Sequence, residues 1–383
     1  MKKENIFGIA MYLIIFAFAV VYGLTVLQTH FEHSTMTEVW QYAVYIISSI
    51  LVGVIISAIL QEFGHFLGAK VGGYKVTKFT ILYFTIYLDN GKYKFGFKNF
   101  DGMTGETLIV PNYEKKDNPN PFPYLLYGPV FNLAWFIGAL ILFFYYNNGN
   151  LFDGDVAYAI LTVGLISAVL FVYDIVPVKL DSSTDGYRLV SLIKNKDRQK
   201  FNELLVAQYE ANHGVLEGKK ESTQNTPEVV KDTADGKLLM LYGLIDEKKY
   251  DEALKLLDEI KEVEGDLTKR GQLEAKEQRL YIKIMTTPID EMVEYYQNEV
   301  SLSLKKEISA DFTIIGIRTY LLMAGLLDKS RSECLIVLKH IAKAYKNTPS
   351  NRKHPELVLF NEALEKVCQA HPKWELEIYK LYE

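Results

Sequence analysis

Apolar and polar residues divide this 383-residue chain into two unlike halves. The first half contains four long stretches without a charged residue, at 6–27, 39–60, 122–146 and 156–173. A helix needs about 20 apolar residues to cross the hydrocarbon core of a bilayer, so these stretches predict four membrane spans. In the second half, a polar connection at 217–225 is followed by segments in which apolar residues recur at helical spacing. These segments predict an all-α domain, with helices over 237–244, 250–262, 267–285, 289–299, 310–326, 333–346 and 355–382.

The segment 74–110, between the second and third spans, has a β pattern instead. Residues 78–88 are rich in Phe, Ile, Tyr and Thr, and Asn90-Gly91 precedes the alternating sequence Lys92–Phe97. Asn-Gly beside a period-two run is typical of a β-hairpin. An open strand edge cannot face lipid. The predicted membrane-associated hairpin therefore either binds an unwound client by strand addition or seals the cytoplasmic mouth of the bundle.

Charge follows the same division, with 28 charged residues in the first 196 positions and 61 in the remaining 187. We expect a first span and external loop at 1–37, a membrane core at 38–196 and a cytosolic helical domain at 197–383. The sequence 247–254 resembles the turn and second-helix start of a tetratricopeptide repeat. Such helix pairs bind protein or peptide partners; the alternative is an irregular α domain that only stabilises the membrane part.

Lysine and arginine are confined to alternate connections of the membrane half. The connections at 28–38 and 147–155 contain none, whereas the second connection has eight lysines and residues 179–198, after the fourth span, include five basic residues. This bias predicts a multi-pass protein of the cell membrane with both termini in the cytoplasm. Two cysteines are too few for a disulfide scaffold, and a net charge of −5 gives no support to nucleic-acid binding.

Ionisable residues at the end of the second span point to a function, because charge is costly in a membrane helix. Gln61 and His65 are four positions apart and share one helical face, and Glu62 lies between them. In the zinc-protease pattern H-E-x-x-H, that face supplies two imidazole ligands and the Glu is the general base. Taken alone, E-x-x-H is more typical of a helix end with a solvated Glu and His.

Two further motifs accompany E-x-x-H in the membrane half. They are Gly128-Pro129 with Asn132 early in the third span, and Asp174 and Pro177 followed by Asp185-Gly186 after the fourth. In this order the motifs resemble those of the site-2 protease family of intramembrane zinc metalloproteases, which has H-E-x-x-H, then Gly-Pro…Asn, then N-x-x-P…D-G. The resemblance covers roughly residues 40–195.

The resemblance implies a role for each matching residue at a Zn²⁺ site. Glu62 would activate the metal-bound water, and His65 and Asp185 would be metal ligands. Asp181 is the rival of Asp185, but the family's ligand directly precedes a glycine, as Asp185 does.

The resemblance also implies a substrate-binding segment in the third span. Asn132, with Gly128 and Pro129, would steady the backbone of a membrane-embedded substrate. For Asn132, pairing with a neighbouring helix is an equally good interpretation.

Gln61 departs from the family pattern at the first His ligand, and Asp174 departs from it at the Asn. Catalytic zinc usually takes three protein ligands and a water, and an amide oxygen is a poor, neutral substitute for imidazole. A natural pseudoprotease, an engineered inactive variant and a site that tolerates a weak ligand all fit Gln61.

The sequence therefore predicts an intramembrane zinc metalloprotease scaffold that cleaves membrane-embedded peptides or proteins near the cytoplasmic face, with the helical domain recruiting a cytosolic partner. Gln61 puts the activity of this chain in question. The alternative is a catalytically dead membrane adaptor that binds transmembrane clients.

Overall fold

The computed structural model describes most of the chain as two compact units, Met1–Leu205 and Val206–Glu383. We call them the membrane unit and the helical unit, and each is described by itself. The described residues are 3–24, 36–89, 92–97, 105–149, 154–178, 184–195, 198–213 and 228–382. Outside them lie the ligand candidate Asp181, the Asn90-Gly91 turn, the polar connection 217–225 and residues 28–35 of the predicted external loop.

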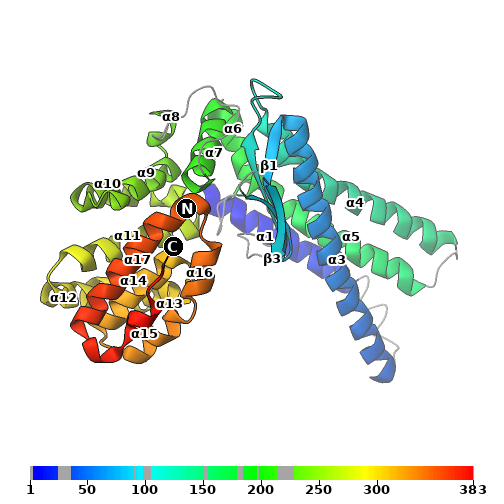
Figure 1. Ribbon diagram of the computed structural model, residues 1–383. Helices are drawn as coiled ribbons and strands as arrows, with labels where there is room; N and C mark the ends of the chain where they lie inside the picture. The colour runs from blue at the N-terminus through cyan, green and yellow to red at the C-terminus, as the bar shows by residue number, and fades with distance from the viewer. Residues whose placement is uncertain are drawn as a thin grey trace. The chain divides into compact units, whose positions relative to one another are not determined.

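The membrane unit is built on long apolar helices (Figure 1). These are α1 (Lys3–Tyr22), α3 (Met36–Gly72), α4 (Pro121–Gly149) and α5 (Gly154–Ile175). Among the described residues, three segments are long and apolar enough to cross a membrane: Val39–Gly72, Pro121–Tyr146 and Val156–Ile175. They indicate a multi-pass membrane protein.

The first predicted span corresponds to α1, whose described apolar part, Met11–Tyr22, is shorter than the other three. It packs on the bundle nonetheless. Met11 is fully buried, and the hydroxyls of Tyr22 and Thr162 of α5 form a hydrogen bond of 3.0 Å. The helix is therefore part of the unit, while its length as a span stays a prediction.

Glycines let the backbones of α3 and α4 approach closely. Gly64, Gly68 and Gly72 are spaced four apart and form one stripe on α3. A Cβ atom on Gly64 would lie 2.5 Å from the carbonyl oxygen of Tyr127, and one on Gly68 would lie 2.1 Å from that of Pro123. Small residues at such spacing allow close helix packing in membranes, where van der Waals contact drives association.

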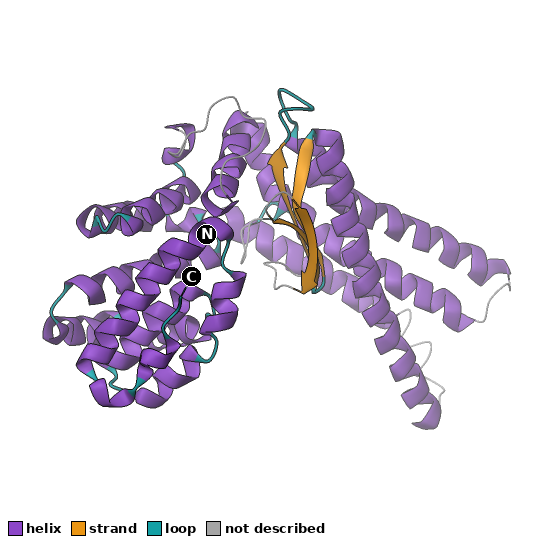
Figure 2. Cartoon of the chain, in the orientation of Figure 1, coloured by secondary structure: helices purple, strands orange, loops and turns teal. Residues whose placement is uncertain are grey.

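A four-stranded antiparallel sheet of order β3-β2-β1-β4 follows α3 (Figure 2). Its strands are β1 (Tyr74–Ile81), β2 (Phe84–Asp89), β3 (Lys92–Phe97) and β4 (Gly105–Pro111). The predicted hairpin is confirmed as β2–β3, with Asp89 paired to Lys92.

The prediction of one strand over 78–88 is wrong, because the chain turns back at Leu82 and Tyr83. Leu82 adopts a positive φ of 53°. This turn has none of the Gly, Pro, Asn or Asp residues that usually mark a turn, which is why the sequence pattern did not reveal β1 and β2 as separate strands.

Strand β1 leaves the end of α3 and runs back along it. Gly105 of β4 pairs with Ile81 at the far end of β1, and a Cβ on Gly105 would lie 2.7 Å from Cγ of Glu62. Glu62 precedes the end of α3 by ten residues, or about 15 Å of helix. The β1–β2 turn beyond Ile81 is apolar. If α3 crosses the membrane, this turn lies back toward the interior of the bilayer.

We expect the β1–β2 turn to contact lipid. A cysteine that replaces Tyr83, which is 65 % exposed, should give an attached environment-sensitive fluorophore a blue-shifted emission in vesicles, quenched by lipid-bound quenchers. Lys92→Cys, at the opposite end of the sheet, is the matched control and should remain accessible to aqueous quenchers. Both native cysteines are buried and should label poorly. Equal aqueous quenching at both positions would contradict the expectation.

The helical unit confirms the predicted all-α region. Its helices are α8 (Glu228–Lys231), α9 (Ala234–Asp246), α10 (Tyr250–Glu262), α11 (Lys269–Thr286), α12 (Ile289–Glu299), α13 (Leu302–Ala310), α14 (Ile314–Leu322), α15 (Arg331–Leu338), α16 (Ile341–Asn347) and α17 (Ser350–Ala370), with α7 (Arg198–His213) crossing the boundary between the units. All nine residues of α14 are buried, and it contacts α11, α13, α15 and α17. The helical core therefore surrounds α14.

Several helix limits differ from the sequence prediction. Helix α13 was not predicted, the helix expected over 333–346 is divided into α15 and α16, and the one expected over 355–382 ends at Ala370. The break after Leu338 has no Gly or Pro to signal it. The predicted turn at 247–249 is correct, since α9 ends at Asp246 and α10 begins at Tyr250.

Buried charges link the helices around α14. Arg318, which is fully buried, pairs with Glu356 of α17 and donates to Oε1 of Gln278 at 2.6 Å. Arg352 pairs with the same Glu356 at 2.9 Å and with Asp246 of α9 at 2.5 Å. Removing one partner of a buried pair typically costs about 3–5 kcal/mol, because the other charge stays buried.

Glu277, in the same core, gives the helical unit a dependence on pH. Burial, and then the Asp311 carboxylate, raise the pKa of Glu277 to about 10 from an ordinary 4.5. The unfolded chain releases this proton near the ordinary pKa while the folded unit keeps it. The contribution of Glu277 to stability is therefore complete below about pH 4.5 and is lost as the pH rises toward 10.

Glu277→Gln should accordingly stabilise the helical unit at pH 8 and change little near pH 4. The measurement is the denaturant midpoint of the full chain at both values, followed by a signal from the helical unit. Glu252→Gln, at an exposed site on α10, is the control and should leave the midpoint unchanged at both. A midpoint that falls at pH 8 in Glu277→Gln would show that the carboxylate is ionised and stabilising.

Candidate functional site

The inner face of α3 carries a row of polar side chains. Ser57, Gln61 and His65 recur every four residues and share that face, and all three are buried. The hydroxyls of Ser57 and Ser167 of α5 form a hydrogen bond of 2.6 Å. Each residue of the row has a partner on another element, so the row connects α3 to the rest of the unit.

Gln61 lies between α4 and α5. Its Nε2 donates to Oδ2 of Asp174 at 2.5 Å, and its Oε1 accepts from Nδ2 of Asn132 at 3.3 Å. Asn132 is fully buried and Asp174 is 9 % exposed. Both ends of the amide are therefore engaged by protein groups inside the bundle.

His65 lies one turn further along the row. Its Nδ1 is 2.8 Å from the carbonyl oxygen of Tyr124, and because a carbonyl only accepts, Nδ1 carries a proton. Its Nε2 is 3.2 Å from Oδ2 of Asp185. Gly128 makes room for this ring, since a Cβ there would lie 2.3 Å from Nε2.

Asp185 is the first residue of α6 (Asp185–Asn195) and is positioned by its neighbours Thr184 and Gly186. Thr184 donates from Oγ1 to the carbonyl oxygen of Val176 at 2.7 Å and accepts from the backbone N–H of Tyr187 at 3.2 Å, as an N-terminal capping residue does. Gly186 has no room for a side chain, because a Cβ would lie 1.9 Å from the carbonyl oxygen of Ile175. Asp185 and Gly186 thus place a carboxylate at the start of α6, next to the end of α5.

Glu62 faces the sheet. Its Oε2 accepts from Oγ1 of Thr107 of β4 at 2.6 Å, and its side chain is 3 % exposed. Tyr124 joins the two parts of the site, because its hydroxyl donates to the carbonyl oxygen of Thr107 at 2.7 Å while its own carbonyl faces His65. The side chain of Glu62 is therefore enclosed between its own helix, α3, and the edge strand β4.

The structure brings together most of the residues that the sequence singled out. Glu62, His65, Asp185, Gln61, Asn132 and Gly128 meet in one buried region, whereas the contacts described for the site do not include Pro129. Asn132 pairs with a neighbouring helix, as its alternative interpretation predicts. Thr107 and Tyr124 were not predicted. Thr107 belongs to a strand that the hairpin prediction did not include, and the hydrogen bond of His65 to Tyr124 is made by the Tyr124 backbone.

The donor set does not complete a zinc site. His65 Nε2 and Asp185 Oδ2 are close enough to share an ion, but the third position holds the Gln61 amide, whose oxygen accepts from Asn132 and whose nitrogen faces Asp174. Within the described ranges, no three His, Cys, Asp or Glu side chains are placed to hold a metal.

Comparison with family models, curated proteins and solved structures found no match to this chain.

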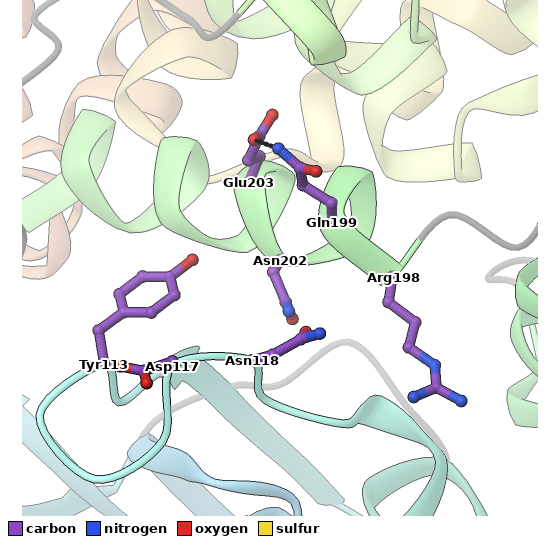
Figure 3. A pocket seen from close by; sticks show the side chains of 7 residues that line it. All are labelled: Tyr113, Asp117, Asn118, Arg198, Gln199, Asn202 and Glu203. Carbon is purple, nitrogen blue, oxygen red and sulfur yellow. Dashed lines mark hydrogen bonds between the residues drawn. The ribbon is translucent and has the colours of Figure 1, made fainter.

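A separate polar cavity of about 610 Å³ lies between the loop after β4 and the start of α7 (Figure 3). Asn202 points from α7 toward this loop; it accepts from the Tyr74 hydroxyl at 2.6 Å and donates to the carbonyl oxygen of Pro119 at 3.2 Å. On the same helix, Gln199 donates to Glu203 at 2.8 Å. None of the predicted site residues lines this cavity. The hydrogen bonds of Asn202 connect α7 to Tyr74 at the start of β1 and to the loop after β4.

Proposed function

We propose that this chain is a membrane protein of the site-2 protease type that binds membrane-embedded peptides or proteins. Because it has Gln61 at a ligand position, it does not cleave them. The observation that carries the proposal is the 3.2 Å approach of His65 Nε2 to Asp185 Oδ2, with Glu62 one turn from His65 on the same helix. These are the three ionisable residues that the motifs assign to the site. Two separate helices, α3 and α6, supply them.

Edge strand β4 supports the client-binding part of the proposal. Among the described residues it pairs with β1 alone, and the outer side of an edge strand is a template for another strand. Thr107 of this strand contacts Glu62. An unwound stretch of a client that adds to β4 is thereby delivered beside Glu62.

Gln61 is the reason for proposing binding without cleavage. Two ionisable donors and an amide that is already hydrogen-bonded at both ends make a weak set for a borderline-soft ion that usually takes three protein ligands. Gln61 therefore favours a membrane adaptor that binds clients over an active protease.

The second candidate function is an active metalloprotease in a form that has His at position 61. It is favoured by the intact support of the other groups: the Tyr124 carbonyl holds the His65 ring, and Thr107 holds Glu62. In such a form, Zn²⁺ would be held by positions 61, 65 and 185.

The remaining parts of the proposal rest on the sequence. Basic residues confined to alternate connections support a cell-membrane location with both termini in the cytoplasm. The helix–turn–helix of α9 and α10, which fits the tetratricopeptide-like pattern, supports recruitment of a cytosolic protein or peptide by the helical unit.

Gln61→His should convert binding into cleavage. The assay uses the full chain in vesicles with a single-span peptide that carries a helix-breaking Gly-Pro near its cytoplasmic end and a photo-crosslinker. The chain as written should crosslink this peptide without cutting it and hold no stoichiometric zinc. Gln61→His should hold zinc and cut the peptide.

Two controls make the outcome decisive. Gln61→His combined with Glu62→Ala should retain zinc and lose cleavage, since only the base is removed. Cleavage by the chain as written that disappears in Glu62→Ala would refute the adaptor reading. Failure of Gln61→His to bind zinc would refute the protease-type site itself.

Proline substitutions along β4 should reduce capture of the same peptide. Proline removes a backbone N–H, so single changes at 106, 107 and 108 sample both sides of the strand. At least one should lower the crosslinking yield severalfold while circular dichroism stays unchanged. The matched changes at 93, 94 and 95 on β3, the opposite edge of the sheet, should leave the yield intact. Equal loss at both edges would count against strand addition at β4.

A further inference from the structure

We propose that Gln61, Asp174 and Asn132 form a hydrogen-bonded lock that closes the bundle without a metal ion. The lock rests on the proposed function only in that position 61 is read as a ligand position. Its contacts run from Asn132 of α4 through Gln61 of α3 to Asp174 of α5. The three candidate membrane-spanning helices are thus tied together at one level.

The two departures from the zinc-protease pattern are in direct contact. Gln61 replaces the first His and Asp174 replaces the Asn, and the structure places their side chains 2.5 Å apart. The contact joins a donor to an acceptor, because the amide nitrogen of Gln61 faces a carboxyl oxygen of Asp174.

The chemistry of Asp174 explains this contact. Oδ2 of Asp174 accepts from the amide nitrogen of Gln61, which turns the amide oxygen of Gln61 toward the donor of Asn132. An asparagine at 174 could present either end of its amide and would leave the direction of Gln61 undetermined.

Burial makes the lock consequential. Gln61, Asn132 and Asp174 are all buried in the bundle, where lipid offers no alternative partner. Removing Gln61 leaves the Asp174 carboxylate without its amide donor, and removing Asp174 leaves that donor without its acceptor. Each single loss is therefore costly, and the second loss adds little to the first.

A double-mutant cycle tests this coupling in the full chain. Gln61→Met and Asp174→Leu keep the approximate size of each side chain and remove its polar group. Unfolding by SDS in mixed micelles gives the unfolding constant of each variant. We expect each single variant to unfold more readily, and the double variant to have an unfolding constant at least about tenfold smaller than the product of the two single effects predicts.

Thr162→Val supplies the matched control. Thr162 is also buried on α5 and hydrogen-bonded to another helix, but it lies 12 residues before Asp174, or about 18 Å along the helix. The unfolding constant of Thr162→Val combined with Gln61→Met should equal the product of the two single effects, which means that the two positions are not coupled. Multiplicative effects in the Gln61–Asp174 cycle as well would overturn the lock.

A second measurement addresses the metal. The unfolding midpoint of the chain as written should be unchanged by added Zn²⁺ or by a chelator, whereas that of Gln61→His should rise with Zn²⁺. A Zn²⁺-dependent rise in the chain as written would overturn the lock, because Gln61 would then serve as a ligand. Peptide capture is scored separately, so a chain with intact coupling and no capture would refute the proposed function alone.

Discussion

The membrane unit depends on one constraint: a polar side chain on the inner face of α3 has to find its partner within the protein. Ser57, Gln61 and His65 satisfy it in turn with α5, with α4 and α5 together, and with the backbone of α4 and the start of α6. Gly64 and Gly68 let α4 approach closely beside the bonds that Gln61 and His65 make to it. Close packing and hydrogen bonding are thus two requirements on the same helix, and different residues of α3 meet each of them.

The site shows what local sequence can and cannot predict. The face shared by Gln61 and His65 follows from helical periodicity, and the Asp-Gly pair at 185 follows from the motif order. What the sequence could not show is that Asp174 touches Gln61, because that contact depends on the rotation of α5 against α3. Thr107 escaped notice for a similar reason. It acts by facing Glu62 from a different element, β4, and that approach depends on how the sheet packs on α3.

The errors in secondary structure have related causes. Leu82 and Tyr83 form a turn from apolar residues, a choice that a water-exposed turn would penalise and that tertiary context overrides here. The break between α15 and α16 is likewise unmarked by glycine or proline. In contrast, α10 and α12 begin and end where their amphipathic pattern does. Periodicity therefore predicts where an element lies, but not a turn or break inside it that no Gly, Pro, Asn or Asp marks.

The central position of α14 has a consequence for how the helical unit behaves as a whole. In a stacked repeat array each pair of helices touches only its neighbours, so pairs can be added, deleted or unfolded from an end. Helix α14 touches α11 before it and α17 after it, and the buried pair of Arg318 with Glu356 spans the same connection. Truncation at the C-terminus would therefore open the centre of the unit rather than shorten it, and the unit should melt in a single cooperative step.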